Sequence, residues 1–179
     1  MPSQKALTLL SSLMLIGLAS CGARVSQCRR LAEPINEANS FIQDYEQDMD
    51  QALAQFSGAQ NLSDINAAAS DYIRAVENVR TELDALAQAT GSVDIEDEQL
   101  NEYRNQYTTV ISQWTAALVT ARDAMRQLTD VTTEEEVRSL FGRFQAQTDS
   151  AYSAIQTIDG QEAALIEGIN AYCSSSVQQ

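Results

Sequence analysis

The sequence contains no histidine among its 179 residues. This absence excludes the Ser-His-Asp and Cys-His arrangements of hydrolases, histidine-ligated haem, the Glu-x-x-His pairs of di-iron helical proteins and an ordinary catalytic zinc site. A glycine-rich phosphate-binding loop is missing as well. We therefore expect a protein that is not an enzyme and that carries no cofactor.

Basic residues are scarce, and lysine is nearly missing. Lys5 is the only lysine, the other basic residues are arginines, and the total of 11 stands against 25 acidic residues. The formal net charge is −14. Because a negative field repels polyanions, we expect no nucleic-acid partner, and we expect the chain to be a monomer.

Long hydrophobic runs are lacking too. The longest apolar run, residues 6–18, has about 13 residues, which is fewer than the roughly 20 that span a bilayer. Lys5 precedes this run, and Leu18-Ala19-Ser20-Cys21 follows it. A short cationic segment, an apolar segment and small residues before the cleavage point are typical of a secretory signal peptide.

The segment Leu18-Ala19-Ser20-Cys21 resembles the lipobox of bacterial lipoproteins. This resemblance implies that residues 1–20 are cleaved, that Cys21 is lipidated, and that its acyl chains hold the mature chain on the membrane in the extracytoplasmic cell envelope. An ordinary secretory signal, which would leave Cys21 a thiol, is the alternative. Gly22 is not the aspartate that retains lipoproteins at the inner membrane in enteric-type sorting, so the outer membrane is favoured if the host has one.

Strand-like alternation is absent, and apolar residues instead recur in steps of three and four, which is the period of an α-helix. Four such segments follow one another with short connections, which favours an all-α, antiparallel up-down-up-down four-helix bundle over 28–173. A lipidated tether, 21–27, precedes the bundle, and a polar tail, 174–179, follows it. The helices are expected at about 28–57, 63–90, 94–128 and 133–173.

Capping and helix-breaking residues predict where the helices begin and bend. Ser63 is a candidate N-cap for the second helix. Thr132 or Thr133 can form a capping box with one of the glutamates that follow. Pro34 is tolerable in a first turn. Gly160, after Asp159, predicts a kink in the fourth segment near 159–160.

Cys28 and Cys173 remain once Cys21 is acylated, and an even pair in an exported chain predicts a disulfide. In a bundle of four alternating helices, the start of the first helix and the end of the last lie at the same end. Two buried thiols are the alternative. The disulfide end must then lie near the bilayer, since the six residues 22–27 extend at most about 20 Å, and the opposite end would meet a partner first.

Binding residues are few, and each has a structural alternative. Carboxylates of one acidic run are candidate calcium ligands, although acids at a helix N-terminus also complement the helix dipole. Aromatic residues on the apolar stripes could line a ligand pocket or fill the core. Glu162 interrupts the fourth stripe, and we expect it to pair with an arginine or to be exposed. The calcium candidates are Asp94, Glu96, Asp97 and Glu98, and the pocket candidates are Tyr72, Tyr103, Tyr107 and Trp114.

These features favour a non-enzymatic envelope lipoprotein, an acidic helical spacer or adaptor that binds an envelope protein through its distal tip or a helix flank. A small-ligand or cation-binding lipoprotein is the alternative. In architecture alone the chain is also similar to the lipid-anchored Q-type extrinsic subunit of cyanobacterial photosystem II. That resemblance implies a third hypothesis, an accessory subunit of a photosynthetic-type membrane complex.

Overall fold

The computed structural model of the chain describes residues 5–175, with side chains from Gly22 onward except those of Asn39 and Phe141. The lipidation predicted at Cys21 concerns a side chain outside the described set. Within residues 5–175 every element is helical, and no strand occurs. The prediction of an all-α fold is confirmed. The helices are α1 (Lys5–Gly58), α2 (Leu62–Gly91), α3 (Glu98–Thr129) and α4 (Glu134–Ser175).

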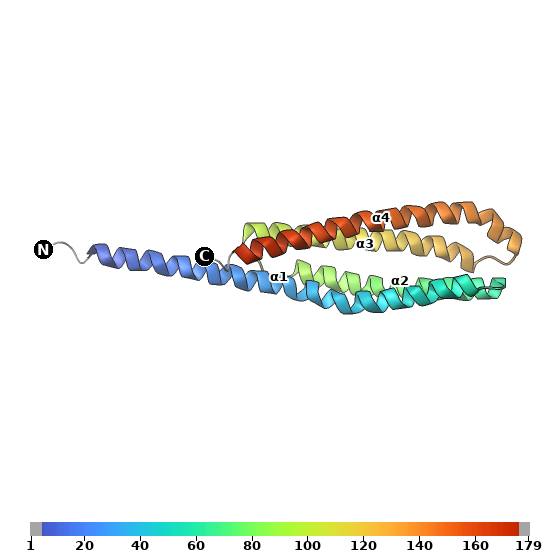
Figure 1. Ribbon diagram of the computed structural model, residues 1–179, viewed down its shortest axis with the longest axis horizontal. Helices are drawn as coiled ribbons and strands as arrows, with labels where there is room; N and C mark the ends of the chain where they lie inside the picture. Colours follow the sequence, from blue (N-terminus) through green and yellow to red (C-terminus); the bar gives the residue numbers. More distant parts are fainter. Residues whose placement is uncertain (1–4, 176–179) are drawn as a thin grey trace.

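The helices pack in the order in which they occur in the chain. α2 lies along α1 on one side and along α3 on the other, and α4 lies along α3. Contacts between α1 and α4 are sparse by comparison. In Figure 1 the pair α1 and α2 forms one side of the molecule, α3 and α4 form the other, and the blue first part of α1 projects beyond the other helices.

The first helix begins at Lys5, so the prediction of a start near Cys28 is wrong. Residues 21–27, the expected tether, are helical, and Pro34 lies inside the helix, not in its first turn. No proline lies between Lys5 and Cys28, and the two glycines of this segment, Gly17 and Gly22, cost only about 1 kcal/mol each in a helix. The segment therefore contains nothing strong enough to stop α1 from continuing upstream.

Two helices start a few residues from the positions that the sequence predicts. The N-cap of α2 is Asn61, not Ser63, because the extended backbone of Asn61 lets its side chain accept from the Asp64 N–H at 3.0 Å. The third helix starts at Glu98 after the N-cap Asp97, so the region from 94 to 97 belongs to the link before it.

The capping box predicted at the start of α4 is confirmed for Thr133. Its hydroxyl accepts from the Glu136 N–H at 3.2 Å, and the Glu136 carboxylate accepts from the Thr133 N–H at 3.1 Å. The same carboxylate accepts from the Thr132 N–H at 2.7 Å. These bonds hold the pKa of Glu136 below its usual value. The α3–α4 link thus ends in the arrangement that its sequence indicates.

The fourth helix passes through Asp159 and Gly160 without a break. The buried residues Ile158 and Leu165 lie on either side of this dipeptide. Because their burial depends on an unbroken helical phase, it outweighs the cost of one glycine, about 1 kcal/mol. The helix is therefore continuous at 159–160, and the kink expected there stays a prediction.

The hydrophobic core runs the length of the molecule and draws on all four helices. Leu31 from α1, Val76 from α2, and Leu100 and Leu118 from α3 are almost completely buried. In α4 the buried residues are Ala151, Ile158, Leu165 and Ile169. In the part of the chain that the structure describes, no helix is long and apolar enough to cross a membrane.

Candidate functional site

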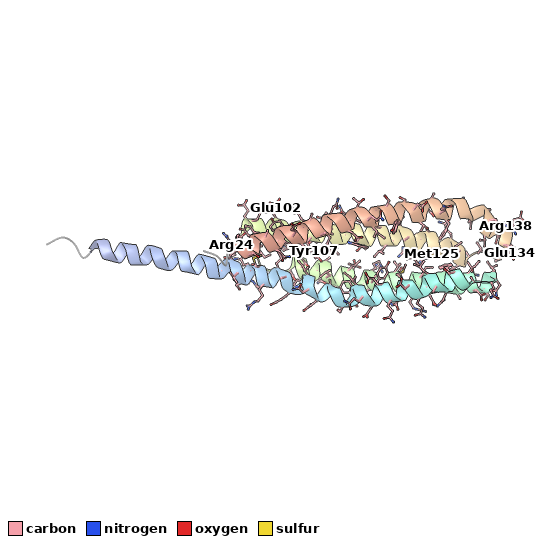
Figure 2. All side chains as sticks on the ribbon, in the orientation of Figure 1. Arg24, Glu102, Tyr107, Met125, Glu134 and Arg138 are labelled. Atoms are coloured by element: carbon pink, nitrogen blue, oxygen red, sulfur yellow. A yellow bond between two sulfur atoms is a disulfide. The ribbon has the colours of Figure 1, made fainter. Side chains whose placement is uncertain are left out.

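A disulfide joins α1 to α4, as the sequence predicts. It links Cys28 to Cys173, whose Cα atoms are 5.9 Å apart across 145 residues of sequence. This Cα separation lies within the range usual for disulfides. The disulfide lies where the projecting part of α1 meets the other helices, and Figure 2 labels Arg24 at this end, opposite Glu134 and Arg138.

Beside the disulfide, the carboxylate of Asp97 connects three helices. It caps α3 by accepting from the Leu100 N–H at 3.0 Å. It also accepts from Nε of Arg24 in α1 at 3.2 Å and from the hydroxyl of Tyr172 in α4 at 3.0 Å. Burial alone would raise the pKa of Asp97, but the bonds from Leu100 and Tyr172 and the charge of Arg24 outweigh it and lower that pKa.

Gln27 adds a second connection from α1 to the α2–α3 link. Its side chain is buried, and its Oε1 accepts from the backbone N–H groups of Glu96 at 2.7 Å and Asp97 at 2.9 Å. A buried amide that satisfies two backbone donors holds the link in one conformation.

Aromatic contacts complete this end of the molecule. The guanidinium of Arg24 lies 5.1 Å from the ring centre of Tyr172, close enough for a cation–π interaction. Tyr103 meets Tyr172 edge to face, with ring centres 6.1 Å apart. We call the side chains that converge here the anchor-end cluster, after the lipid anchor that the sequence predicts at Cys21. Its members are Arg24, Gln27, Cys28, Asp97, Tyr103, Tyr172 and Cys173.

The predicted calcium candidates are not assembled into a metal site. Asp97 is occupied by hydrogen bonds within the anchor-end cluster, whereas Asp94, Glu96 and Glu98 are exposed. Among the residues whose side chains are described, no group of three acidic or cysteine side chains is placed to hold a metal ion. The structural alternative for this run, an acidic helix N-terminus, agrees with the N-cap role of Asp97.

An internal cavity of about 60 Å³ lies between the four helices. Of the four predicted pocket residues, Tyr107 and Trp114 line it, and Tyr45 from α1 joins them. Tyr72 is buried in the core, and Tyr103 belongs to the anchor-end cluster. The remaining lining residues are Ile42, Val79, Leu83, Leu86, Val110, Ile111, Leu118 and Glu162.

Glu162 is the charged residue of this cavity. Its Oε1 accepts from the Tyr107 hydroxyl at 3.2 Å, and its Oε2 accepts from the indole N–H of Trp114 at 3.3 Å. Its hydrogen-bond partners are thus neutral donors and the residue is half-buried, so it shows neither the arginine pairing nor the exposure that we expected. Burial, followed by the charge of Glu162, raises the pKa of Tyr107, so this tyrosine stays a hydrogen-bond donor at ordinary pH.

Some of these residues can be predicted from the sequence, and others cannot. Glu162 was identifiable because it breaks an apolar stripe. Arg24 and Gln27 were missed because both fall in the segment expected to be a tether. The sequence offers one signal for Arg24 and Gln27, which is that the helical period can be extended upstream of Cys28.

Comparisons of the chain with protein-family models, with curated proteins and with solved structures found no match.

Proposed function

We propose that this protein is a non-enzymatic lipoprotein of the bacterial cell envelope. In this proposal residues 1–20 are a cleaved signal peptide, Cys21 carries the lipid, and the mature chain is an antiparallel up-down-up-down four-helix bundle. The bundle acts as an acidic spacer or adaptor that offers its distal end to a protein partner. Loss of Lys5 with the leader changes the formal net charge from −14 to −15.

The anchor-end cluster is the observation that carries this proposal. It joins α1 to α4 through Cys28 and to the α2–α3 link through Gln27, within seven residues of the lipobox cysteine. A spacer needs a stiff base, because bending at the attachment point would leave its far end undirected. A covalent bond and buried polar contacts at this end supply that stiffness.

Helix geometry gives the dimensions of the spacer. Seven helical residues from Cys21 to Cys28 span about 10 Å at 1.5 Å per residue, half the reach of an extended tether. The 30 residues of α2 measure about 45 Å by the same rise. The distal links, residues 59–61 and 130–133, would therefore lie roughly 55 Å from the lipid.

The distal end is polar, which indicates the kind of partner it suits. Asn61 and Asp64 cap one of its helices, and Glu134, Glu135 and Glu136 begin another. Glu134 is exposed and pairs with Arg138 at 3.5 Å. A partner surface with basic and hydrogen-bonding groups would complement this end.

The lipid anchor is tested by a substitution at Cys21. We expect the wild-type chain, expressed with its leader in a bacterium, to incorporate radiolabelled palmitate and to sediment with membranes. Cys21→Ala should do neither. Release of unlabelled wild-type protein in soluble form would support the ordinary secretory alternative and contradict the lipoprotein proposal.

The adaptor role is tested by capturing the lipidated protein from its native membrane after mild crosslinking. We expect a specific partner that is lost with the distal double variant Glu134→Arg/Glu135→Arg. The matched control is Glu102→Arg, an exposed glutamate near the opposite end, where Figure 2 labels it. Failure to recover a partner, or equal loss of the partner with both variants, would contradict binding through the distal tip.

One observation favours the second candidate, a small-ligand or cation-binding lipoprotein. It is the carboxylate of Glu162 in the internal cavity. The third hypothesis, an accessory subunit of a photosynthetic-type complex, stays a prediction from architecture alone.

A further inference from the structure

The internal cavity contains a carboxylate, that of Glu162, which forms no ion pair with a basic side chain in the described part of the chain. Each carboxylate oxygen of Glu162 accepts one hydrogen bond from a neutral donor. Apart from Glu162, the lining is aliphatic or aromatic. A charged group beside apolar surface is costly unless a counter-charge accompanies it.

The lining indicates which chemical class would supply that counter-charge. A carboxylate has about four lone-pair sites, and only two are used by Tyr107 and Trp114. The rings of Tyr45, Tyr107 and Trp114 also line the cavity, and aromatic faces attract cations. A cation with N–H donors and a small apolar part therefore matches both the polar and the apolar surroundings.

The volume of the cavity limits the size of this cation. The cavity measures about 60 Å³, whereas an engineered apolar cavity of about 150 Å³ holds one benzene molecule, which has six non-hydrogen atoms. Methylammonium, with two non-hydrogen atoms, fits this space. Tetramethylammonium, with five, is too large and has no N–H to donate.

We propose that this cavity binds a small primary alkylammonium ion, with its N–H groups on the Glu162 carboxylate and its carbon against the aromatic and aliphatic lining. The site goes beyond the adaptor role and does not rest on it. Glu162 also lines a hollow on the outer surface of α4 with Asp159, Glu167 and Asn170. Acidic side chains on the outer surface therefore lie beside the binding group.

Trp114 provides a direct readout, because it is the single tryptophan of the chain and its indole donates to Glu162. Methylammonium chloride is titrated into the purified full-length protein against sodium chloride at constant ionic strength. We expect a saturable change in Trp114 fluorescence and in its indole ¹H–¹⁵N resonance. Half-saturation should be on the order of 1–10 mM, because so few atoms can contribute little binding free energy.

Matched variants separate the site from the general acidity of the helix. Glu162→Gln keeps the side-chain length and groups able to pair with Tyr107 and Trp114, but removes the charge, so we expect it to weaken binding by at least about tenfold. Glu167→Gln, which shares the outer hollow and does not line the cavity, should change binding less than about twofold.

Three results would overturn the proposal: no saturable response to methylammonium, an equal response to tetramethylammonium, or an unchanged response in Glu162→Gln. Circular dichroism shows whether that variant folds. The comparison of methylammonium with tetramethylammonium uses the wild-type protein, so it decides the question even if the variant does not fold.

Discussion

At the residue scale, the buried side chain of Gln27 holds the α2–α3 link in place. Its amide oxygen is the hydrogen-bond acceptor for both the Glu96 and the Asp97 backbone N–H groups. Gln27→Ala would leave these donors without that acceptor, at a cost of about 1–3 kcal/mol in the free energy of unfolding. Urea denaturation measures this change.

The control for Gln27 is Gln106, an exposed glutamine of α3 whose amide donates to Glu102 one turn away. Gln106→Ala should change the free energy of unfolding by less than about 0.5 kcal/mol. Equal effects of the two variants would mean that the buried bonds of Gln27 contribute no more than a surface pair.

Asp97 gives a pH-dependent prediction. Its pKa is lowered in the folded protein, so its ionised form adds stability above the unfolded value of about 3.9, and that stability is lost as pH falls through the lowered value. Asp97→Asn keeps a capping oxygen but loses the charge. We expect the variant to be about 1 kcal/mol less stable at neutral pH, with the difference closing in acid.

Denaturation of both proteins from pH 7 to pH 2 tests this prediction. Taking the difference between wild type and variant isolates Asp97 from other titrating carboxylates such as Glu77, whose bonds to Arg122 and Arg80 also lower its pKa. Asp94→Asn, in the same link but exposed, is the matched control. A difference that stays constant with pH would exclude a role for the Asp97 charge.

The sequence predicts a site residue when its amino-acid type and its position in the expected fold together determine what it does. The pairing of Cys28 with Cys173 follows from residue identity and topology. The partners of Glu162 could not be predicted, because helical period places a residue on a face without saying which neighbouring side chain it meets. Only the packed structure brings Tyr107 and Trp114 to its two oxygens.

At the scale of elements, the two glycines in the second half of α4 make a matched pair. Apart from its chain neighbours and the nearby backbone of α4, an added Cβ at Gly160 would meet no described atom within 4 Å, whereas at Gly168 it would lie 3.3 Å from the hydroxyl oxygen of Tyr103. Gly160→Ala should raise the free energy of unfolding by about 0.5–1 kcal/mol, since α4 is continuous there. Gly168→Ala should raise the free energy of unfolding by less, because the Tyr103 side chain must move to make room for the added methyl group.

Thermal unfolding of the two variants checks this expectation. Destabilisation by Gly160→Ala would show that the backbone bends at this glycine in solution, as the Asp-Gly dipeptide suggests. If Gly168→Ala and Gly160→Ala raise the melting temperature equally, Tyr103 is not held in the anchor-end cluster.

Helix existence was predictable along this chain, but helix starts were less so. Apolar residues that recur every three or four positions identify each helix, because a polar residue in that series would have to lie in the core. The residue at which a helix starts depends on smaller free energies. Asn61 and Ser63, for example, differ as N-caps by only a fraction of the roughly 1 kcal/mol that a cap supplies. The upstream part of α1 is not predicted from the sequence, because its apolar residues have the pattern of a signal peptide.

At the scale of the whole molecule, the Cys28–Cys173 disulfide closes a loop that contains nearly the entire bundle. Restricting so long a loop in the unfolded chain adds about 2–5 kcal/mol of stability in the chain-entropy account. We expect Cys28→Ser/Cys173→Ser to fold with the same helix content and to melt at least about 5 °C lower.

Melting curves of the wild-type protein with and without reductant give the same comparison without substitution. The double variant should not respond to reductant, which makes it the control. A wild-type midpoint that does not move on reduction would show that the disulfide adds nothing to stability, or that it does not form in the exported protein.

The position of this disulfide also has a mechanical consequence. Suppose that the chain is pulled between a point in α1 before Cys28 and its C-terminal residues. The tension would then pass from Cys28 to Cys173 through the sulfur atoms, and the residues between them would carry no load. The bundle would resist traction on its two termini with the strength of a covalent bond, although tension between one terminus and the distal tip could still pull its helices apart.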